Sequence, residues 1–217
     1  SMHVPAICIA GWSDSGKTTL IERLIPLLTV RGLRVGVVKH THHALEMDKP
    51  GSDTDRYRSA GASAVALAAP DGTGVLDARP ARLAEALAAL HDVDLILVEG
   101  FDQEACLPAL EVWRTPEAPM RSREQWRRAV ITDLPYEGPL PVFSPSATDS
   151  AADFLLTLAE EQRQNAVPGL SVSLNGQELY LTPFVQRMLA GALDGMLRTL
   201  DGYQEGCEIT LRMKGKT

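Results

Sequence analysis

The loop of residues 11–18, Gly-Trp-Ser-Asp-Ser-Gly-Lys-Thr, has the residue types and the spacing that phosphate binding requires. Phosphate oxygens are bound by backbone N–H groups, which can approach only where side chains do not block them. Gly11 and Gly16 leave that space, and a helix beginning after them would add the positive end of its dipole. The pattern therefore predicts a P-loop for a nucleoside triphosphate, in preference to a glycine-rich turn that only caps a helix.

Side chains at the end of this loop predict where charge and metal would be placed. Lys17 can reach the β- and γ-phosphates, and the Thr18 hydroxyl can bind Mg²⁺. Thr19 is suited to bond a further phosphate. The other loop residues that we expect around the phosphates are Ser13, Asp14, Ser15 and Gly16.

A P-loop site also needs an acidic group at the end of a neighbouring buried strand, where it can hold the metal or its water shell. Glu99 directly follows the apolar run 95–98 and fits that position. The alternative is a solvated carboxylate at a strand end, and the nearby P-loop favours the metal role. Asp94 begins the same run and lies at the wrong end, so we expect it to be structural.

The stretch 39–43, Lys-His-Thr-His-His, and the following Asp48 form a second polar cluster. Zinc is disfavoured there, because adjacent histidines point in different directions and no cysteine completes a tetrahedral set. We expect instead that Asp48 assists Mg²⁺ or the attacking water, and that Lys39 with the histidines contacts phosphates of nucleotide or substrate. The alternative is that Lys39 and His40 pair with neighbouring carboxylates.

Asp133 is the candidate for recognition of a guanine base. A carboxylate can accept two hydrogen bonds from the Watson–Crick edge of guanine, which a neutral amide cannot do. Asp133 follows the apolar run 129–132, but its neighbours do not read Asn-Lys-x-Asp. A turn-forming aspartate before Leu-Pro is an equally good interpretation. The loop 144–147 could line the base through its backbone.

The elements that would position these groups alternate between strand and helix patterns, which predicts an α/β fold of P-loop NTPase type. We expect a mostly parallel sheet with helices on both faces, within a nucleotide-binding domain of residues 3–165. Pro26 should kink the first helix or loosen its middle. Strands are expected at 4–10, 34–39, 62–69, 94–98, 110–113, 129–132 and 140–143, and a turn at 72–74 should lead into a brief edge strand. Helices are expected at 18–30, 52–60, 81–90 and 149–162.

Residues 166–217 have a different pattern and predict a small ββαβ appendage. Asn175-Gly176 between short apolar runs is a strong hairpin signal, because both central residues of a type I′ turn need positive φ. A helix is expected at 185–200 and a last strand at 208–213. About 50 residues are at the size limit for independent folding, so the appendage should dock on the main domain or on a partner chain.

Composition excludes several classes of protein. The net charge of −7 and the pI near 5.2 argue against non-specific nucleic-acid binding. No apolar run approaches the roughly 20 residues of a membrane span, and we expect a cytoplasmic protein. The cysteines are too few and too scattered for a disulfide framework, so we expect reduced, buried thiols at Cys8, Cys106 and Cys207.

Several motifs together resemble the B protein family of molybdopterin-guanine dinucleotide biosynthesis, over roughly residues 4–160. They are Gly-Trp-Ser-x-x-Gly-Lys-Thr-Thr at 11–19, Lys-His-Thr-His-His at 39–43, Asp-Lys-Pro-Gly at 48–51, Ala-Gly-Ala at 60–62 and Leu-Val-Glu-Gly-Phe at 97–101. The resemblance implies a homodimeric GTP-binding protein with slow hydrolysis. It further implies an adaptor for the guanylyltransferase that joins GMP to molybdopterin, with molybdopterin or its guanine dinucleotide as a further ligand.

The resemblance also implies roles for individual residues. Phosphates and Mg²⁺ would be bound by Gly16, Lys17, Thr18 and Thr19. Asp48 and Glu99 would serve the metal, and Asp133 would contact guanine. The segment 52–54 departs from the family pattern, since it reads Ser-Asp-Thr where that pattern has a lysine before Asp-Ser.

Three functions compete at this point. A GTP-binding adaptor with slow turnover is favoured, because the predicted switch loops contain no identifiable arginine finger or water-orienting glutamine. The alternative is a P-loop kinase or transferase, in which the loop 40–51 holds a small phosphorylated acceptor. A purely structural scaffold is disfavoured because Lys17 and Thr18 are both intact.

Overall fold

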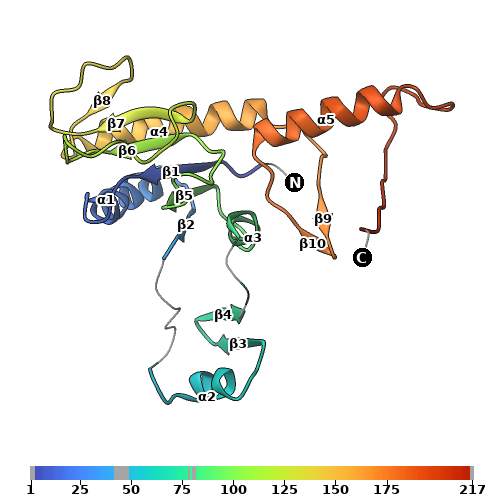
Figure 1. Ribbon diagram of the computed structural model, residues 1–217, viewed down its shortest axis with the longest axis horizontal. Coiled ribbons are helices and arrows are strands. Elements are labelled where there is room, and N and C mark those ends of the chain that lie inside the picture. Colours follow the sequence, from blue (N-terminus) through green and yellow to red (C-terminus); the bar gives the residue numbers. More distant parts are fainter. Residues whose placement is uncertain (1–2, 42–48, 78, 80–81, 216–217) are drawn as a thin grey trace.

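A six-stranded parallel sheet forms the centre of the molecule (Figure 1). The computed structural model describes residues 3–41, 49–77, 79 and 82–215, and its sheet has the order β2-β5-β1-β6-β7-β8. Every neighbouring pair in it is parallel, which confirms the predicted α/β fold. The strands are β1 (Ala6–Ala10), β2 (Val35–Lys39), β5 (Leu95–Glu99), β6 (Ala109–Val112), β7 (Arg127–Ile131) and β8 (Val142–Phe143).

Both faces of this sheet are buried. Ile7 and Leu97 belong to one apolar cluster with residues of α1 and α4, whereas Cys8 and Val98 belong to a second cluster with Leu87 of α3. Successive residues of β1 and β5 therefore face different helices, which explains why these strands are apolar at nearly every position. The helices are α1 (Lys17–Val30), α3 (Leu83–Ala88) and α4 (Thr148–Asn165).

Helix α1 continues without a break across Pro26, so the proline does not divide it. Its end is marked by Gly32, whose φ is 83°. The Gly32 N–H donates to the carbonyl of Thr29, and the Leu33 N–H donates to the carbonyl of Leu28. These are the two hydrogen bonds of a Schellman motif, which requires a left-handed residue and so favours glycine.

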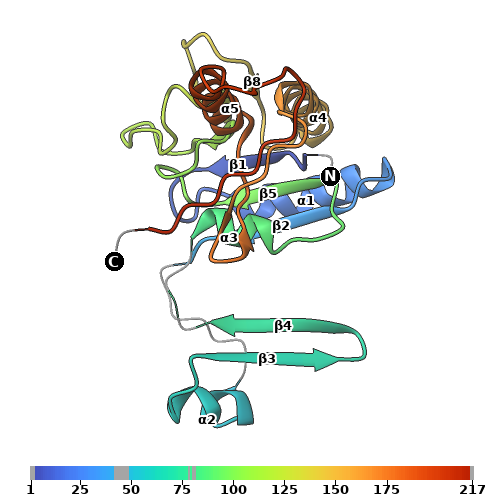
Figure 2. The ribbon, with the colours of Figure 1, turned by 90° about the vertical axis from the view of Figure 1, so that its right-hand side faces the viewer.

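The segment between β2 and α3 forms a unit that stands apart from the main sheet (Figures 1 and 2). Its two strands pair only with each other and are antiparallel, whereas we expected a strand of the main sheet and a brief edge strand. The physical reason is the connection, since Pro70 and Asp71 alone link the strands and so short a link can join only antiparallel neighbours. The elements are α2 (Asp53–Ser59), β3 (Ala64–Ala69) and β4 (Gly72–Asp77).

The C-terminal part contains the expected hairpin and helix. Asn175 and Gly176 have φ of 51° and 82°, as a type I′ turn requires. The hydroxyl of Thr182 accepts from the N–H of Val185 at 3.3 Å and caps the next helix. The elements are β9 (Ser173–Leu174), β10 (Gln177–Glu178) and α5 (Pro183–Leu197).

The last predicted strand, at 208–213, is wrong. These residues have no strand partner, and their apolar side chains Ile209, Leu211 and Met213 are exposed. An alternating pattern forms a strand only where a second strand pairs with it, and among the described residues none pairs with this segment. The appendage is therefore ββα within the described residues.

The cysteines match the expectation only in part. All three are free, but Cys8 alone is buried, Cys106 is half-buried and Cys207 is exposed. Burial raises the pKa of the Cys8 thiol, which keeps it protonated and unreactive. In the described part of the chain, no helix combines the length and the apolar character needed to cross a membrane.

Candidate functional site

The loop between β1 and α1 has the backbone that the sequence motif requires. Gly11 and Gly16 have φ of 145° and 100°, and Asp14 is also left-handed with φ of 60°. A Cβ atom on Gly11 would lie 2.6 Å from the carbonyl oxygen of Val112 and 2.8 Å from Oγ of Ser15. Side chains are thus excluded at this position both by conformation and by space.

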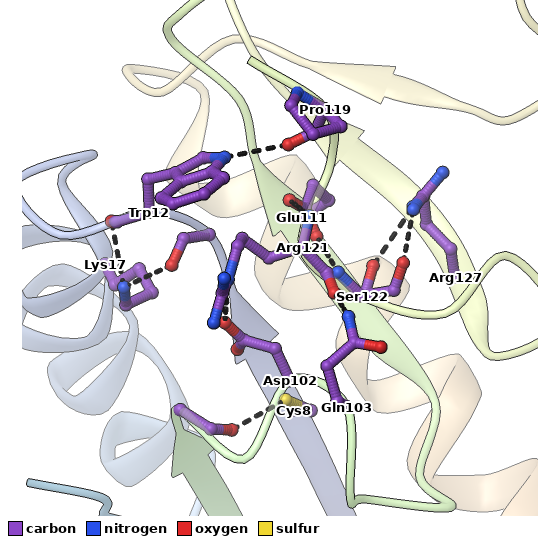
Figure 3. Close-up of polar contacts among 12 residues, drawn as sticks. Cys8, Trp12, Lys17, Asp102, Gln103, Glu111, Pro119, Arg121, Ser122 and Arg127 are labelled. Carbon is purple, nitrogen blue, oxygen red and sulfur yellow. Dashed lines mark hydrogen bonds and ion pairs between the residues drawn. The ribbon is translucent and has the colours of Figure 1, made fainter.

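Lys17 folds back over this loop (Figure 3). Its Nζ donates to the carbonyl oxygens of Gly11 at 2.5 Å and Trp12 at 2.9 Å. The first turn of α1 has no acidic residue, and its N-cap, Gly16, has no side chain with which to cap it. Ser15 is buried, and its hydroxyl has no hydrogen-bond partner among the described residues. Donors and positive charge converge here, which suits an anion with several oxygens.

Thr18 and Glu99 come together on the β5 side of the loop. The Thr18 hydroxyl donates to Oε1 of Glu99 at 3.0 Å, and Nζ of Lys39 lies 4.0 Å from the same oxygen. The Glu99 side chain is only 12% exposed. A hydroxyl and a carboxylate side by side are oxygen ligands of the kind that Mg²⁺ prefers.

The opposite end of β5 has no such arrangement. Asp94 forms a two-pronged pair with Arg34, with Nε at 3.1 Å from Oδ2 and Nη2 at 3.0 Å from Oδ1. This hydrogen bonding lowers the pKa of Asp94 to about 2. The carboxylate therefore ties the beginnings of β2 and β5 together.

The described part of the polar stretch after β2 lies beside Glu99. The ring of His40 stacks on Phe101, with centroids 4.1 Å apart and planes at 11°. Gly100 is needed at this crossing, because its φ is 90° and a Cβ there would lie 2.8 Å from Cβ of His40. His42, His43 and Asp48 lie outside the described residues. Within the described ones, no group of three or more His, Cys, Asp or Glu could hold a metal ion.

Asp133 and the loop 144–147, both candidates for contact with a base, are brought together beyond the end of β7. Oδ1 of Asp133 accepts from the hydroxyl of Ser144 at 2.7 Å, and that hydroxyl lies 3.0 Å from Oγ of Ser146. Asp133 is exposed, and the N–H of Leu134 donates to Oγ1 of Thr132 in the turn. Asp133 is thus held by a hydroxyl while its carboxylate remains open to solvent.

A network around Trp12 was missed in the sequence (Figure 3). The indole Nε1 of Trp12 donates to the carbonyl of Pro119 at 2.7 Å, and the guanidinium carbon of Arg121 lies 4.6 Å from the ring centroid. Nε of Arg121 pairs with Oδ2 of Asp102 at 3.2 Å. Burial raises the pKa of Asp102. The phosphate loop is thereby braced from outside by residues about 90 to 110 positions away in the chain.

Glu111 supports this network from within the sheet. It is fully buried, and its two carboxylate oxygens accept from the backbone N–H groups of Arg121 at 2.5 Å and Ser122 at 2.9 Å. A glutamate inside the otherwise apolar strand β6 was the one signal in the sequence that pointed to this network. A buried carboxylate needs such donors.

Arg114 was also missed. It lies two residues beyond the end of β6, and its guanidinium carbon lies 3.8 Å from where a Cβ atom on Gly16 would be. The sequence signal was an arginine at the carboxyl end of a buried strand, which is the edge of a parallel sheet where ligands bind.

Comparison with known proteins identifies the family. The family model described as molybdopterin guanine dinucleotide synthesis protein B (MobB) matches residues 6–133, which is more than half of the chain. The chain belongs to the MobB family. The matched region covers the sheet from β1 to β7 and includes the phosphate loop, Glu99 and Asp133.

Relatives and solved structures agree with membership of the MobB family. The chain is 36% identical over 157 residues to the molybdopterin-guanine dinucleotide biosynthesis adapter protein of Haemophilus influenzae, covering 70% of this chain and 88% of that protein. The protein of the same name from Escherichia coli is 34% identical over 170 residues, covering 73% and 95%. The crystal structure of Bacillus subtilis MobB aligns with a TM-score of 0.59 and 26% identity, covering 71% of this chain and 98% of that one.

Proposed function

We propose that this chain is a GTP-binding adaptor in molybdopterin guanine dinucleotide biosynthesis, which binds GTP with Mg²⁺ and hydrolyses it slowly. The observation that carries the proposal is the hydrogen bond between Thr18 and Glu99 beside an intact phosphate loop. The adapter names of the Haemophilus influenzae and Escherichia coli relatives support the pathway. The partner it would assist is the guanylyltransferase, with molybdopterin or its guanine dinucleotide as a further ligand.

The residues of the loop fit a triphosphate. The N–H groups of residues 13–19 would bind its oxygens, and Lys17 would exchange its two loop carbonyls for the β- and γ-phosphates. Bound Mg²⁺ would neutralise charge that builds on the phosphates. Thr18 and Glu99 would hold the ion or its water shell, together with Asp48, and Asp133 would accept from guanine.

Slow hydrolysis is supported by the environment of Glu99. Gln103 lies four residues further on, but its amide is engaged by donating to the carbonyl of Arg121 (Figure 3). Glu99 itself accepts from Thr18. Within the described residues, neither side chain is therefore set to orient an attacking water, as efficient GTPases require.

A homodimer is proposed through the ribbon of β3 and β4. A two-stranded ribbon is marginal in water, and the side chains of Leu67 and Val75 on it are 39% and 70% exposed. Its outer edges also carry backbone donors and acceptors that a second copy of the ribbon could pair. Chromatography coupled to light scattering should give twice the chain mass, and a charge placed at Val75 should shift the protein to monomer.

We also propose that residues 3–165 and 166–217 are two structural units. The second unit is tied to the first by the Tyr180 hydroxyl, which donates to the carbonyl of Val4 at 2.6 Å. The rings of Phe184 and Trp126 also meet edge to face across the two units, with centroids 5.6 Å apart. These contacts support docking of the appendage on the main domain.

Calorimetric titration with GTP and with ATP, each with and without Mg²⁺, tests the proposal. Selective, Mg²⁺-dependent binding of GTP is expected, followed by slow release of phosphate. Preference for ATP, or no discrimination, would overturn the role of Asp133. A phosphorylated small acceptor among the products would identify a kinase instead.

A further inference from the structure

Arg114 is fixed next to the phosphate loop by the backbone around it. The N–H of Trp113 donates to the carbonyl of Ile131 at 3.0 Å, which continues the pairing of β6 with β7. The indole of Trp113 donates to the carbonyl of Ala118 at 3.3 Å, and the N–H of Ala118 closes a turn onto Thr115 at 3.1 Å. These hydrogen bonds therefore hold the backbone on both sides of Arg114. The residue lies at the edge of the sheet at which β1 leads into the phosphate loop.

The guanidinium of Arg114 lies over Gly16. Its carbon and its Nε are 3.8 Å and 3.9 Å from the position of a Cβ atom on Gly16, and apart from Gly16 and its two chain neighbours no other described residue has a heavy atom within 4 Å of that point. A side chain at position 16 would thus enter the space between the guanidinium and the first turn of α1. Glycine keeps that space open on the side of the loop that faces β6.

The charge of Arg114 is not balanced by a carboxylate. Among the described residues it forms no ion pair. The buried or half-buried carboxylates of the region are engaged elsewhere, Glu99 by Thr18 and Asp102 by Arg121. The guanidinium instead lies beside Gly16, which is the N-cap at the positive end of α1. Positive groups held close together repel one another, and an anion between them removes that cost.

We propose that Arg114 binds the α- and β-phosphates of the nucleotide, an inference that rests on the proposed function. The position of Arg114 in the strand order indicates which phosphates it would contact. β1 lies between β5, whose last residue Glu99 accepts from Thr18, and β6, which ends two residues before Arg114. β7, with Asp133 after it, lies beyond β6. Arg114 therefore lies between two parts of the proposed site. The metal and the terminal phosphate would be on the β5 side of it, and the base would be on the β7 side.

The chemistry of the side chain suits this role. A guanidinium presents two parallel N–H donors to two oxygens of a phosphate, and it stays charged at all accessible pH values. Lysine at this position would keep the charge and lose the paired geometry. The contact comes from within the same chain, so it needs no activating partner to supply it.

Titration of GTP and GDP into the wild type and into Arg114→Ala tests the inference, with Arg187→Ala as a control that removes the same charge from exposed α5. In the described part of the chain, the Arg187 side chain donates one hydrogen bond, to the carbonyl of Asn165. Arg114→Ala is expected to weaken GTP and GDP binding by the same factor, about tenfold, which equals about 1.4 kcal/mol. Arg114→Lys should recover part of that loss, and Arg187→Ala should bind as the wild type does.

Two further measurements distinguish a phosphate contact of Arg114 from a structural role. The melting temperature without nucleotide should be unchanged in Arg114→Ala, and its GDP affinity should depend less steeply on salt than that of the wild type. Unchanged affinity for both nucleotides, or a loss confined to GTP, would overturn the placement on the α- and β-phosphates. If the wild type binds neither nucleotide, the proposed function itself fails.

Discussion

The hydroxyl of Thr18 donates a hydrogen bond of 3.0 Å to Oε1 of Glu99, although 81 positions separate the two residues in the chain. Thr18 stands in the first turn of α1 and Glu99 ends β5, and the register of Ile9 opposite Glu99 brings these elements together. A metal held between them would be bonded to both the loop and the sheet.

Glu99→Gln should therefore uncouple GTP binding from Mg²⁺. The amide keeps the shape of the side chain and removes its charge, so we expect Mg²⁺ to improve GTP affinity at least tenfold less than in the wild type. Calorimetry with and without Mg²⁺ measures this ratio. Asp94→Asn, at the other end of β5, should leave the ratio unchanged, and an equal effect of both variants would argue against a metal role for Glu99.

Lys17→Ala should weaken GTP binding at least tenfold, about 1.4 kcal/mol or more, without unfolding the protein. The reason is that Nζ contacts only loop carbonyls among the described residues and contributes nothing to the apolar core. Equilibrium titration and a melting curve give the two readings. Retention of wild-type affinity would remove Lys17 from the site.

Asp133→Asn should lower the affinity for GTP more than that for xanthosine triphosphate. Guanine has an exocyclic amine that donates to a carboxylate, whereas xanthine has a carbonyl oxygen at that position, to which the amide of the variant can donate. The GTP complex therefore loses a hydrogen bond that the xanthosine triphosphate complex replaces. Competition titrations with both nucleotides give the ratio. Asp153→Asn is the control, since that exposed carboxylate pairs with Arg31 on the surface; equal losses for the two nucleotides would make Asp133 a turn residue only.

Glu111→Gln should destabilise the fold by about 1–3 kcal/mol, because the buried carboxylate accepts two backbone N–H groups and its amide can accept with one oxygen only. Urea unfolding followed by circular dichroism measures the change. Glu160→Gln makes the same chemical change in an exposed pair with Arg163 and should cost much less. A small effect at Glu111 would mean that the turn at 121–122 does not depend on it.

The pair of Arg34 and Asp94 should contribute stability that depends on pH. The folded pKa of Asp94, about 2, lies below its ordinary value of 3.8, so the contribution is complete above pH 4 or so and is lost as the pH falls towards 2. The difference in unfolding free energy between the wild type and Asp94→Asn should shrink over that range. A difference that stays constant down to pH 2 would contradict the pairing.

Local patterns were sufficient to predict much of the fold and the strand, loop and helix that carry the proposed phosphate site. The apolar runs of β1 and β5 and the loop between β1 and α1 are contiguous in sequence, so their structure follows from neighbouring residues. The turn at Asn175 and Gly176 was predictable for the same reason, since it depends on two residues that accept positive φ.

Contacts between distant segments were not predictable in this way. The approach of Arg114 to Gly16 and the clamp of Arg121 on Trp12 depend on the order of β1, β6 and β7, which no local pattern encodes. The wrong prediction of a strand at 208–213 has the same cause. Alternating apolar and polar residues indicate that a segment could form a strand with one apolar face, but they do not indicate whether a second strand is there to pair with it. Likewise, the residue pattern of β3 did not indicate that β4 is the strand with which it pairs among the described residues.

The bonds of Lys17 to its own loop have a calorimetric consequence. If the loop binds a nucleotide as proposed, the ammonium would give up the carbonyl oxygens of Gly11 and Trp12 for phosphate oxygens, so the number of its hydrogen bonds would hardly change. The heat released by this exchange is therefore smaller than the final contacts alone would suggest. The loop carbonyls would thus compete with phosphate for the Lys17 ammonium, and breaking their hydrogen bonds would offset part of the favourable binding energy.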